Sequence, residues 1–97
     1  MSITIFRDVP GATADFYDAV VAGLGLDWEP ASGLIMHVAG QQDGVWREIF
    51  VWESRESWDA FEHDRIGPAV VALIGAEAAA AASPSSTQIM ETHNLLT

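Results

Sequence analysis

Hydrophobic positions along the chain repeat with two different periods, which predict strands and helices. Alternation at every second residue predicts strands over residues 2–7, 33–40, 45–53 and 87–95. Apolar residues spaced three and four apart predict one helix from Thr13 to about Leu24, and a second that begins after Ser54. Thr13 and Ser54 are both residue types that cap helix N-termini, which supports these two starting points.

The second helical region contains Gly67-Pro68, which is predicted to interrupt it because proline lacks a backbone donor. A further helical run follows from Ala69 to about Ala82, and a polar break over 83–86 separates it from the last strand. The order β-α-β-β-α-(α)-β is the ferredoxin-like arrangement, an α+β fold whose antiparallel sheet carries helices on one face. Residues 1–97 are therefore expected to form a single domain. In so small a chain the other sheet face should be buried against a second copy, giving a homodimer through the open sheet face.

Composition narrows the classes of partner. The net charge is −10, with four arginines and no lysine, so the chain repels phosphate backbones and anionic lipid surfaces. Neither a nucleic acid nor a membrane is expected as a partner. The absence of cysteine excludes disulfides, thiol catalysis and thiolate metal sites. No signal peptide and no apolar run long enough to span a bilayer are visible, so a cytoplasmic location is expected.

The most informative stretch is 45–58, which contains three of the four tryptophans. By the two-residue period, one face of its strand is shared by Trp46, Glu48, Phe50 and Trp52. A carboxylate among aromatic rings needs a partner, because an unpaired buried charge is costly. A hairpin loop of two residues or of four puts His37 on this same face, and the four-residue loop puts it directly opposite Glu48.

Three segments in this half of the chain resemble a known family. They are Gly33-Leu34-Ile35-Met36-His37-Val38, the strand from Gly44 that ends in Trp52-Glu53-Ser54, and Trp58 followed three residues later by Phe61. Together with the element order, they resemble the dimeric α+β barrel superfamily, and within it the branch similar to antibiotic-biosynthesis monooxygenases. Members of that superfamily include cofactor-free quinone-forming monooxygenases, haem-degrading enzymes and small-molecule isomerases.

The resemblance implies a cavity between sheet and helices, with Trp52 facing it. We therefore predict a pocket with His37, Glu48 and Trp52 as candidate catalytic residues, and with Phe16, Phe50 and Trp58 as candidate substrate contacts. A His–Glu pair in an apolar pocket is suited to acid–base work near neutral pH. The same pair is also compatible with a purely structural role, as two polar groups that satisfy each other across the strands. Trp52 likewise fits either the core or the active site.

The resemblance leaves two functions open. One is a cofactor-free monooxygenase that acts on an aromatic or polyketide-like substrate, and the other is a non-catalytic ligand-binding or accessory protein of the same fold. In the quinone-forming branch an asparagine stands at the place of Glu48 and a tyrosine near the place of Trp58, so this chain lacks two hydrogen-bonding groups of that site. A small apolar or aromatic ligand is expected in either case.

No cofactor and no metal site are predicted. The haem-degrading branch needs a histidine ligand after the second helix, and residues 68–73 contain none. His37, His63 and His93 show no spacing typical of metal ligands, and His63 beside Asp64 is expected on the solvated side of its helix.

Overall fold

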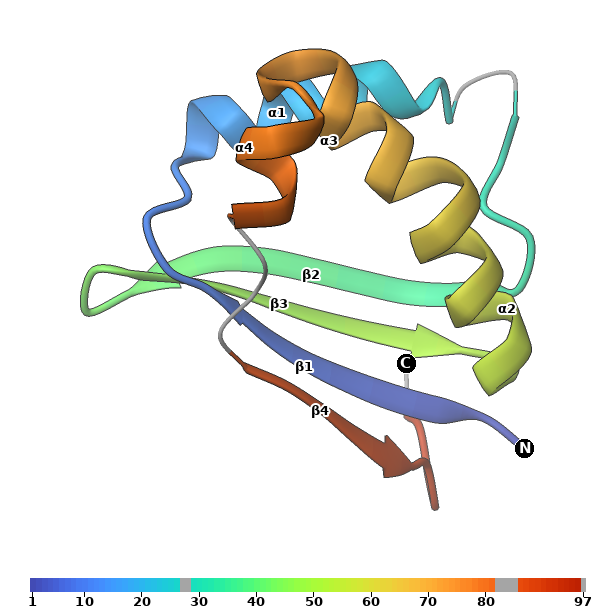
Figure 1. Ribbon diagram of the computed structural model, residues 1–97. Helices are drawn as coiled ribbons and strands as arrows, with labels where there is room; N and C mark the ends of the chain where they lie inside the picture. The colour runs from blue at the N-terminus through green and yellow to red at the C-terminus, as the bar shows by residue number, and fades with distance from the viewer. Residues whose placement is uncertain (27–28, 82–85, 97) are drawn as a thin grey trace.

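A computed structural model describes residues 1–26, 29–81 and 86–96 of the chain. One layer is a four-stranded antiparallel sheet with the strand order β2-β3-β1-β4 (Figure 1). Its strands are β1 (Ile3–Val9), β2 (Leu34–Gln42), β3 (Val45–Trp52) and β4 (Ser86–Glu91). The predicted α+β sheet, with its helices on one face, is confirmed. The last strand was predicted over residues 87–95, but it ends at Glu91 and is therefore shorter than predicted.

The helices form a second layer over one face of the sheet (Figure 1). They are α1 (Ala14–Leu24), α2 (Arg55–Phe61), the π-helical turn η1 (Glu62–Ile66), α3 (Gly67–Ile74) and α4 (Ala76–Ala81). The predicted N-caps are confirmed: the hydroxyl of Thr13 accepts from the backbone N–H of Phe16, and that of Ser54 from Ser57. The end predicted near Ala82 and most of the polar break over 83–86 lie outside the described residues.

The interruption predicted at Gly67-Pro68 is wrong. Residues 55–74 are helical without a gap, and Pro68 lies in the first turn of α3, where a missing N–H is best tolerated. The N–H of Gly67 bonds to the carbonyl of Glu62, five residues back, so a π turn replaces the break. The helix ends instead at Gly75, whose φ of 87° few other residues adopt.

The β2–β3 hairpin determines which residues face the helices. Asp43 and Gly44 form a two-residue turn with φ of 51° and 81°, and Gln42 pairs with Val45. Of the two loop lengths compatible with the sequence, the chain adopts the shorter. His37 is therefore opposite Phe50, and Glu48 is opposite Ala39.

The core lies between the sheet and α2, at the end of the sheet where β3 meets that helix. Its buried residues are Ile3, Ile5, Phe50, Trp52, Trp58 and Phe61. The Trp52 ring contacts those of Trp58 and Phe61, with centroids 6.0 and 5.1 Å apart. This aromatic cluster packs α2 against β3 and also contacts the ring of Phe50.

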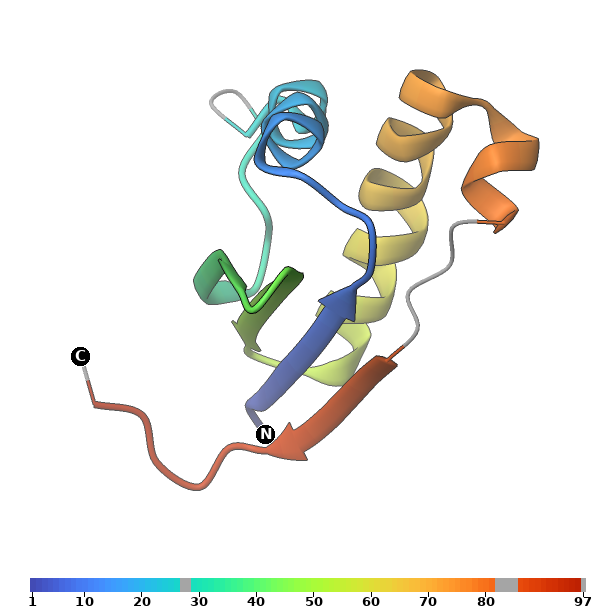
Figure 2. The ribbon, with the colours of Figure 1, turned by 90° about the vertical axis from the view of Figure 1, so that its left-hand side faces the viewer.

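No helix covers the other face of the sheet (Figure 2). This open face carries Phe6, Val38 and Met90, all exposed hydrophobic side chains. Within the described ranges, no helix is both long and apolar enough to cross a membrane.

Candidate functional site

A cavity of about 1050 Å³ lies between the helix-facing side of the sheet and helices α1, α3 and α4. Most of its wall is apolar, contributed by residues that include Val9, Phe16, Val20, Leu34, Phe50, Ile66, Val70 and Val71. Six polar side chains interrupt that wall: Arg7, Tyr17, His37, Glu48, Glu62 and His63. An apolar cavity with a few convergent polar groups is typical of a small-molecule site.

His37 is held from three sides. Its Nδ1 lies 3.0 Å from the carbonyl oxygen of Ile49, and its Nε2 lies 2.7 Å from the hydroxyl of Tyr17. The ring also stacks on Phe50, with centroids 4.1 Å apart and planes inclined by 15°. Because a carbonyl only accepts, Nδ1 carries the proton of the neutral ring, and Nε2 accepts from Tyr17. His37 is thereby oriented to take a proton from the Tyr17 side.

Tyr17 was not among the residues predicted for the site, yet it is the partner of His37. Burial raises the pKa of Tyr17 above its ordinary value of 10.0, and the negative charges of Glu48 and Asp18 raise it further. The sequence does contain a signal, because Tyr17, Val20, Val21 and Leu24 follow helical spacing and all line the cavity. The prediction named only Phe16 from this helix as a cavity residue and did not consider the neighbouring Tyr17.

The predicted pairing of His37 with Glu48 is wrong. Glu48 accepts a hydrogen bond from the indole Nε1 of Trp46, at 3.2 Å. The two-residue hairpin turn is the reason, since it shifts the strand register by two residues and places His37 opposite Phe50. Glu48 still lines the cavity together with His37, and its charge acts on Tyr17.

The predicted aromatic residues divide into two groups. Phe16 and Phe50 line the cavity, in agreement with the expectation for their location. Trp52 and Trp58 do not: both are buried in the core, and Trp52 has no exposed surface. The expectation that Trp52 faces the cavity is corrected by its position under α2, where Trp58 and Phe61 enclose it. Among the described residues, its buried indole N–H has no hydrogen-bond partner.

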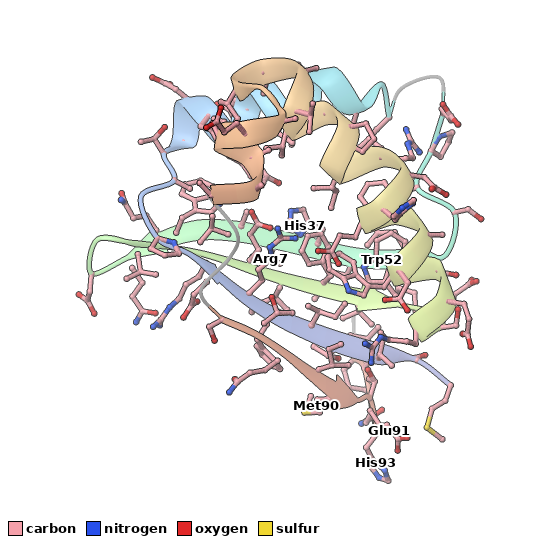
Figure 3. The ribbon with its side chains drawn as sticks, in the orientation of Figure 1. Arg7, His37, Trp52, Met90, Glu91 and His93 are labelled. Atoms are coloured by element: carbon pink, nitrogen blue, oxygen red, sulfur yellow. The ribbon has the colours of Figure 1, made fainter. Side chains whose placement is uncertain are left out.

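Arg7 is a second cavity residue that the sequence reasoning missed. It lies on β1 directly opposite Glu48, and Figure 3 shows it with His37 in the space between sheet and helices. Its nearest carboxylate is that of Glu62, with 4.0 Å between Nη1 and Oε1, and the Trp58 ring lies 6.0 Å from its guanidinium carbon. The alternation Ile3, Ile5, Arg7 puts it on the same face as two core residues, which was the available signal.

Metal ligation finds no support in the described part of the chain, where no group of three or more His, Cys, Asp or Glu residues could hold an ion. His63 lies in the exposed pair with Asp64, with 2.8 Å between Nδ1 and Oδ1, as expected for a solvated position.

No protein-family model and no curated protein matches the sequence. Solved structures do match. A candidate antibiotic biosynthesis monooxygenase from Chloroflexus aurantiacus has a TM-score of 0.58 and 18% identity, with coverage of 100% of this chain and 98% of its own. A protein of unknown function from Nitrosomonas europaea has a TM-score of 0.66 and 17% identity over 99% and 93% of the two chains.

A variant of SnoaB, a cofactor-independent oxygenase from Streptomyces nogalater, has a TM-score of 0.60 and 18% identity over 98% and 96% of the two chains. These similarities extend over the whole described fold. Because the sequence identities are 18% or lower, they establish a shared fold and nothing further. The chain therefore has the same α+β, ferredoxin-like fold as these solved structures.

Proposed function

We propose that this protein is a cofactor-free monooxygenase, which binds a flat aromatic or polyketide-like molecule in the cavity and oxidises it. The observation that carries the proposal is the hydrogen bond between Tyr17 and His37 in the wall of an otherwise apolar cavity. Oxygenation without a cofactor requires a substrate that can be ionised, because an electron-rich carbanion or enolate reacts with O₂ directly. The site must therefore accept a proton.

The Tyr17–His37 pair has the geometry for that step. The Tyr17 oxygen takes a proton from the substrate as its own proton passes to Nε2 of His37. The carbonyl of Ile49 then stabilises the resulting imidazolium through Nδ1–H. For a ring CH₂ that is conjugated with a carbonyl through aromatic rings, as in an anthrone, the overall reaction consumes one O₂, converts the CH₂ to C=O and releases one water.

The other predicted site residues have supporting roles in this proposal. Phe16 and Phe50 contact the ligand from the cavity wall, and Glu48 keeps Tyr17 protonated through its negative charge. Trp52 and Trp58 act through Phe50, whose ring lies 6.4 and 5.0 Å from theirs, so they position the cavity wall without touching the ligand.

A homodimer through the open sheet face belongs to the same proposal. Phe6, Val38 and Met90 leave apolar surface exposed on that face, and a second copy would bury it. Nearby, Arg47 is paired with Asp8 at 3.2 Å, so its charge is already compensated at the edge of such an interface.

One observation favours a non-catalytic ligand-binding or accessory protein as the alternative. In the family that the sequence resembles, the tryptophan matching Trp52 lines the active site, whereas here it is enclosed in the core. Such a protein would use the cavity to hold a ligand without oxidising it.

Oxygen uptake with an anthrone and no added cofactor tests the proposal. The wild type should consume one O₂ per substrate, and His37→Gln should abolish uptake. His93→Gln is the matched control, since His93 lies beyond the sheet and away from the cavity (Figure 3). Ligand binding by tryptophan quenching without oxygen uptake would favour the accessory protein. A protein that neither binds the anthrone nor takes up oxygen would contradict both functions.

A further inference from the structure

Arg7 differs from the other three arginines of the chain in its hydrogen bonds. Arg47, Arg55 and Arg65 each donate at least one hydrogen bond, at 2.7, 3.3 and 2.6 Å respectively. Arg7 forms an ion pair with Glu62 at 4.0 Å, and within the described part of the chain its buried Nε has no hydrogen-bond partner. A guanidinium has five N–H donors, so most of the binding capacity of Arg7 is unused by the protein.

The missing hydrogen bonds of Arg7 matter because its side chain is largely buried. The Arg7 side chain is 12% exposed, against 50% for Arg47 and 59% for Arg55. A charge that is removed from water without hydrogen bonds costs free energy. Arg7 is nevertheless on a central strand, and its side chain lines the cavity. A position this costly is explained when a ligand supplies the missing acceptors.

The arrangement of the wall indicates where that ligand group would lie. Arg7 is on β1 and His37 is on β2, with β3 between them. Two strand spacings and an offset of two residues along the strands separate their backbones by about 12 Å, roughly the length of a two-ring aromatic system with one substituent. Glu48 lies between the two, opposite Arg7, with an oxygen already engaged by Trp46.

We propose that the cavity selects the anionic form of its aromatic ligand, with a carboxylate or an ionised ring hydroxyl bound by Arg7. This inference rests on the proposed function in that the cavity must hold an aromatic molecule. Nη1 of Arg7 is the atom paired with Glu62, which leaves Nη2 to donate a charge-assisted hydrogen bond to an anionic oxygen group of the ligand. Glu62 competes with the ligand, but its side chain is 46% exposed and can turn to water.

Two pairs of probes test the inference, each with one anionic and one neutral member. They are naphthoate with naphthamide, and lawsone, a naphthoquinone ionised at neutral pH, with its methyl ether. Binding is measured by quenching of tryptophan fluorescence. We expect the anionic member of at least one pair to bind about ten- to a hundredfold more tightly than its neutral partner, because charge-assisted hydrogen bonds are the stronger kind. The pair that shows the preference distinguishes a carboxylate from a ring hydroxyl.

Substitutions test whether Arg7 causes the preference for the anionic probe. Arg7→Gln should remove it, while Arg47→Gln, which changes an exposed arginine, should leave it intact. Glu62→Gln should increase anion affinity several-fold by removing the competing carboxylate, and it keeps the inference testable if Arg7→Gln does not fold.

Three results would overturn the inference. They are equal binding within both pairs, a preference that survives in Arg7→Gln, and unchanged anion affinity in Glu62→Gln. With equal binding, the protein still holds aromatic ligands and the proposed function stands. If no member of either pair binds, the proposed function fails together with this inference.

Discussion

The hydroxyl of Tyr17 donates to Nε2 of His37 across 2.7 Å, because the other ring nitrogen of His37 already donates to the carbonyl of Ile49. The pair joins α1 to β2, so the polar contact that carries the proposed chemistry also fixes the helix layer above the sheet. The acidity of Tyr17, the stability of the contact and the turnover of the protein are therefore linked, and each can be measured.

The first prediction concerns the pKa of Tyr17. Burial, then Glu48, then Asp18 raise that pKa above its ordinary value of 10.0. Tyr17 is the single tyrosine of the chain, so the tyrosinate absorbance reports it without interference from another phenol. The midpoint should lie above 10.0, and Glu48→Gln should lower it by removing a negative charge. Asp59→Asn, at an exposed carboxylate on α2, should leave it unchanged.

The same shift gives the direction of the pH dependence of stability. Above pH 10.0 the folded protein retains the Tyr17 proton while the unfolded chain releases it, so the free energy of unfolding falls as the pH rises. A tyrosine midpoint at or below the ordinary value would refute the assignment of Tyr17 to a desolvated cavity wall.

A second prediction separates the structural and chemical roles of the hydroxyl. Tyr17→Phe removes the donor and keeps the ring, so it should cost about 1 kcal/mol of unfolding free energy, the net value of a hydrogen bond. Turnover with an anthrone should fall much further, because the proton relay is lost. Full activity in Tyr17→Phe would rule out the relay.

The third prediction uses Trp52. Its enclosure by Trp58 and Phe61 makes it packed core, so Trp52→Ala should lower the free energy of unfolding by about 3–5 kcal/mol. Urea denaturation measures the change. Phe16→Ala, at the cavity wall, is the comparison and should cost clearly less, because the cavity already leaves one side of that ring without packing. A loss at Trp52 as small as the one expected at Phe16 would show that Trp52 borders open space.

The sequence determines the architecture of this chain more fully than its site. Periodicity and capping residues were sufficient for the four strands, for α1 and for the start of α2, because each is a local property. The site depends on the hairpin register, and two loop lengths were compatible with the sequence. The choice between them moved His37 from Glu48 to Phe50. Pro68 failed as a helix breaker because a π turn, which local pattern does not reveal, accommodates it.

Tyr17 and Arg7 were overlooked for a related reason. Each was at a position that the periodic pattern assigns to the interior, but the prediction searched for polar partners only within the β2–β3 hairpin. Tyr17 reaches His37 from a helix twenty residues earlier in the chain, and Arg7 reaches the cavity from β1. Contacts of that kind depend on tertiary packing, which brings α1 and β1 to the hairpin.

The last prediction tests the open sheet face. Val38 and Met90 are exposed on strands at opposite edges of the sheet, and Met90 points away from the helices (Figure 3). Val38→Glu places a charge in the proposed dimer interface, where it would be desolvated, so it should convert the dimer to a folded monomer. Leu73→Glu is the matched control, since Leu73 is similarly exposed but lies on α3 in the helix layer. Sedimentation at micromolar concentration distinguishes the two states. A wild type that sediments as a stable monomer, or a Val38→Glu variant that remains dimeric, would show that the open face is not the dimer interface.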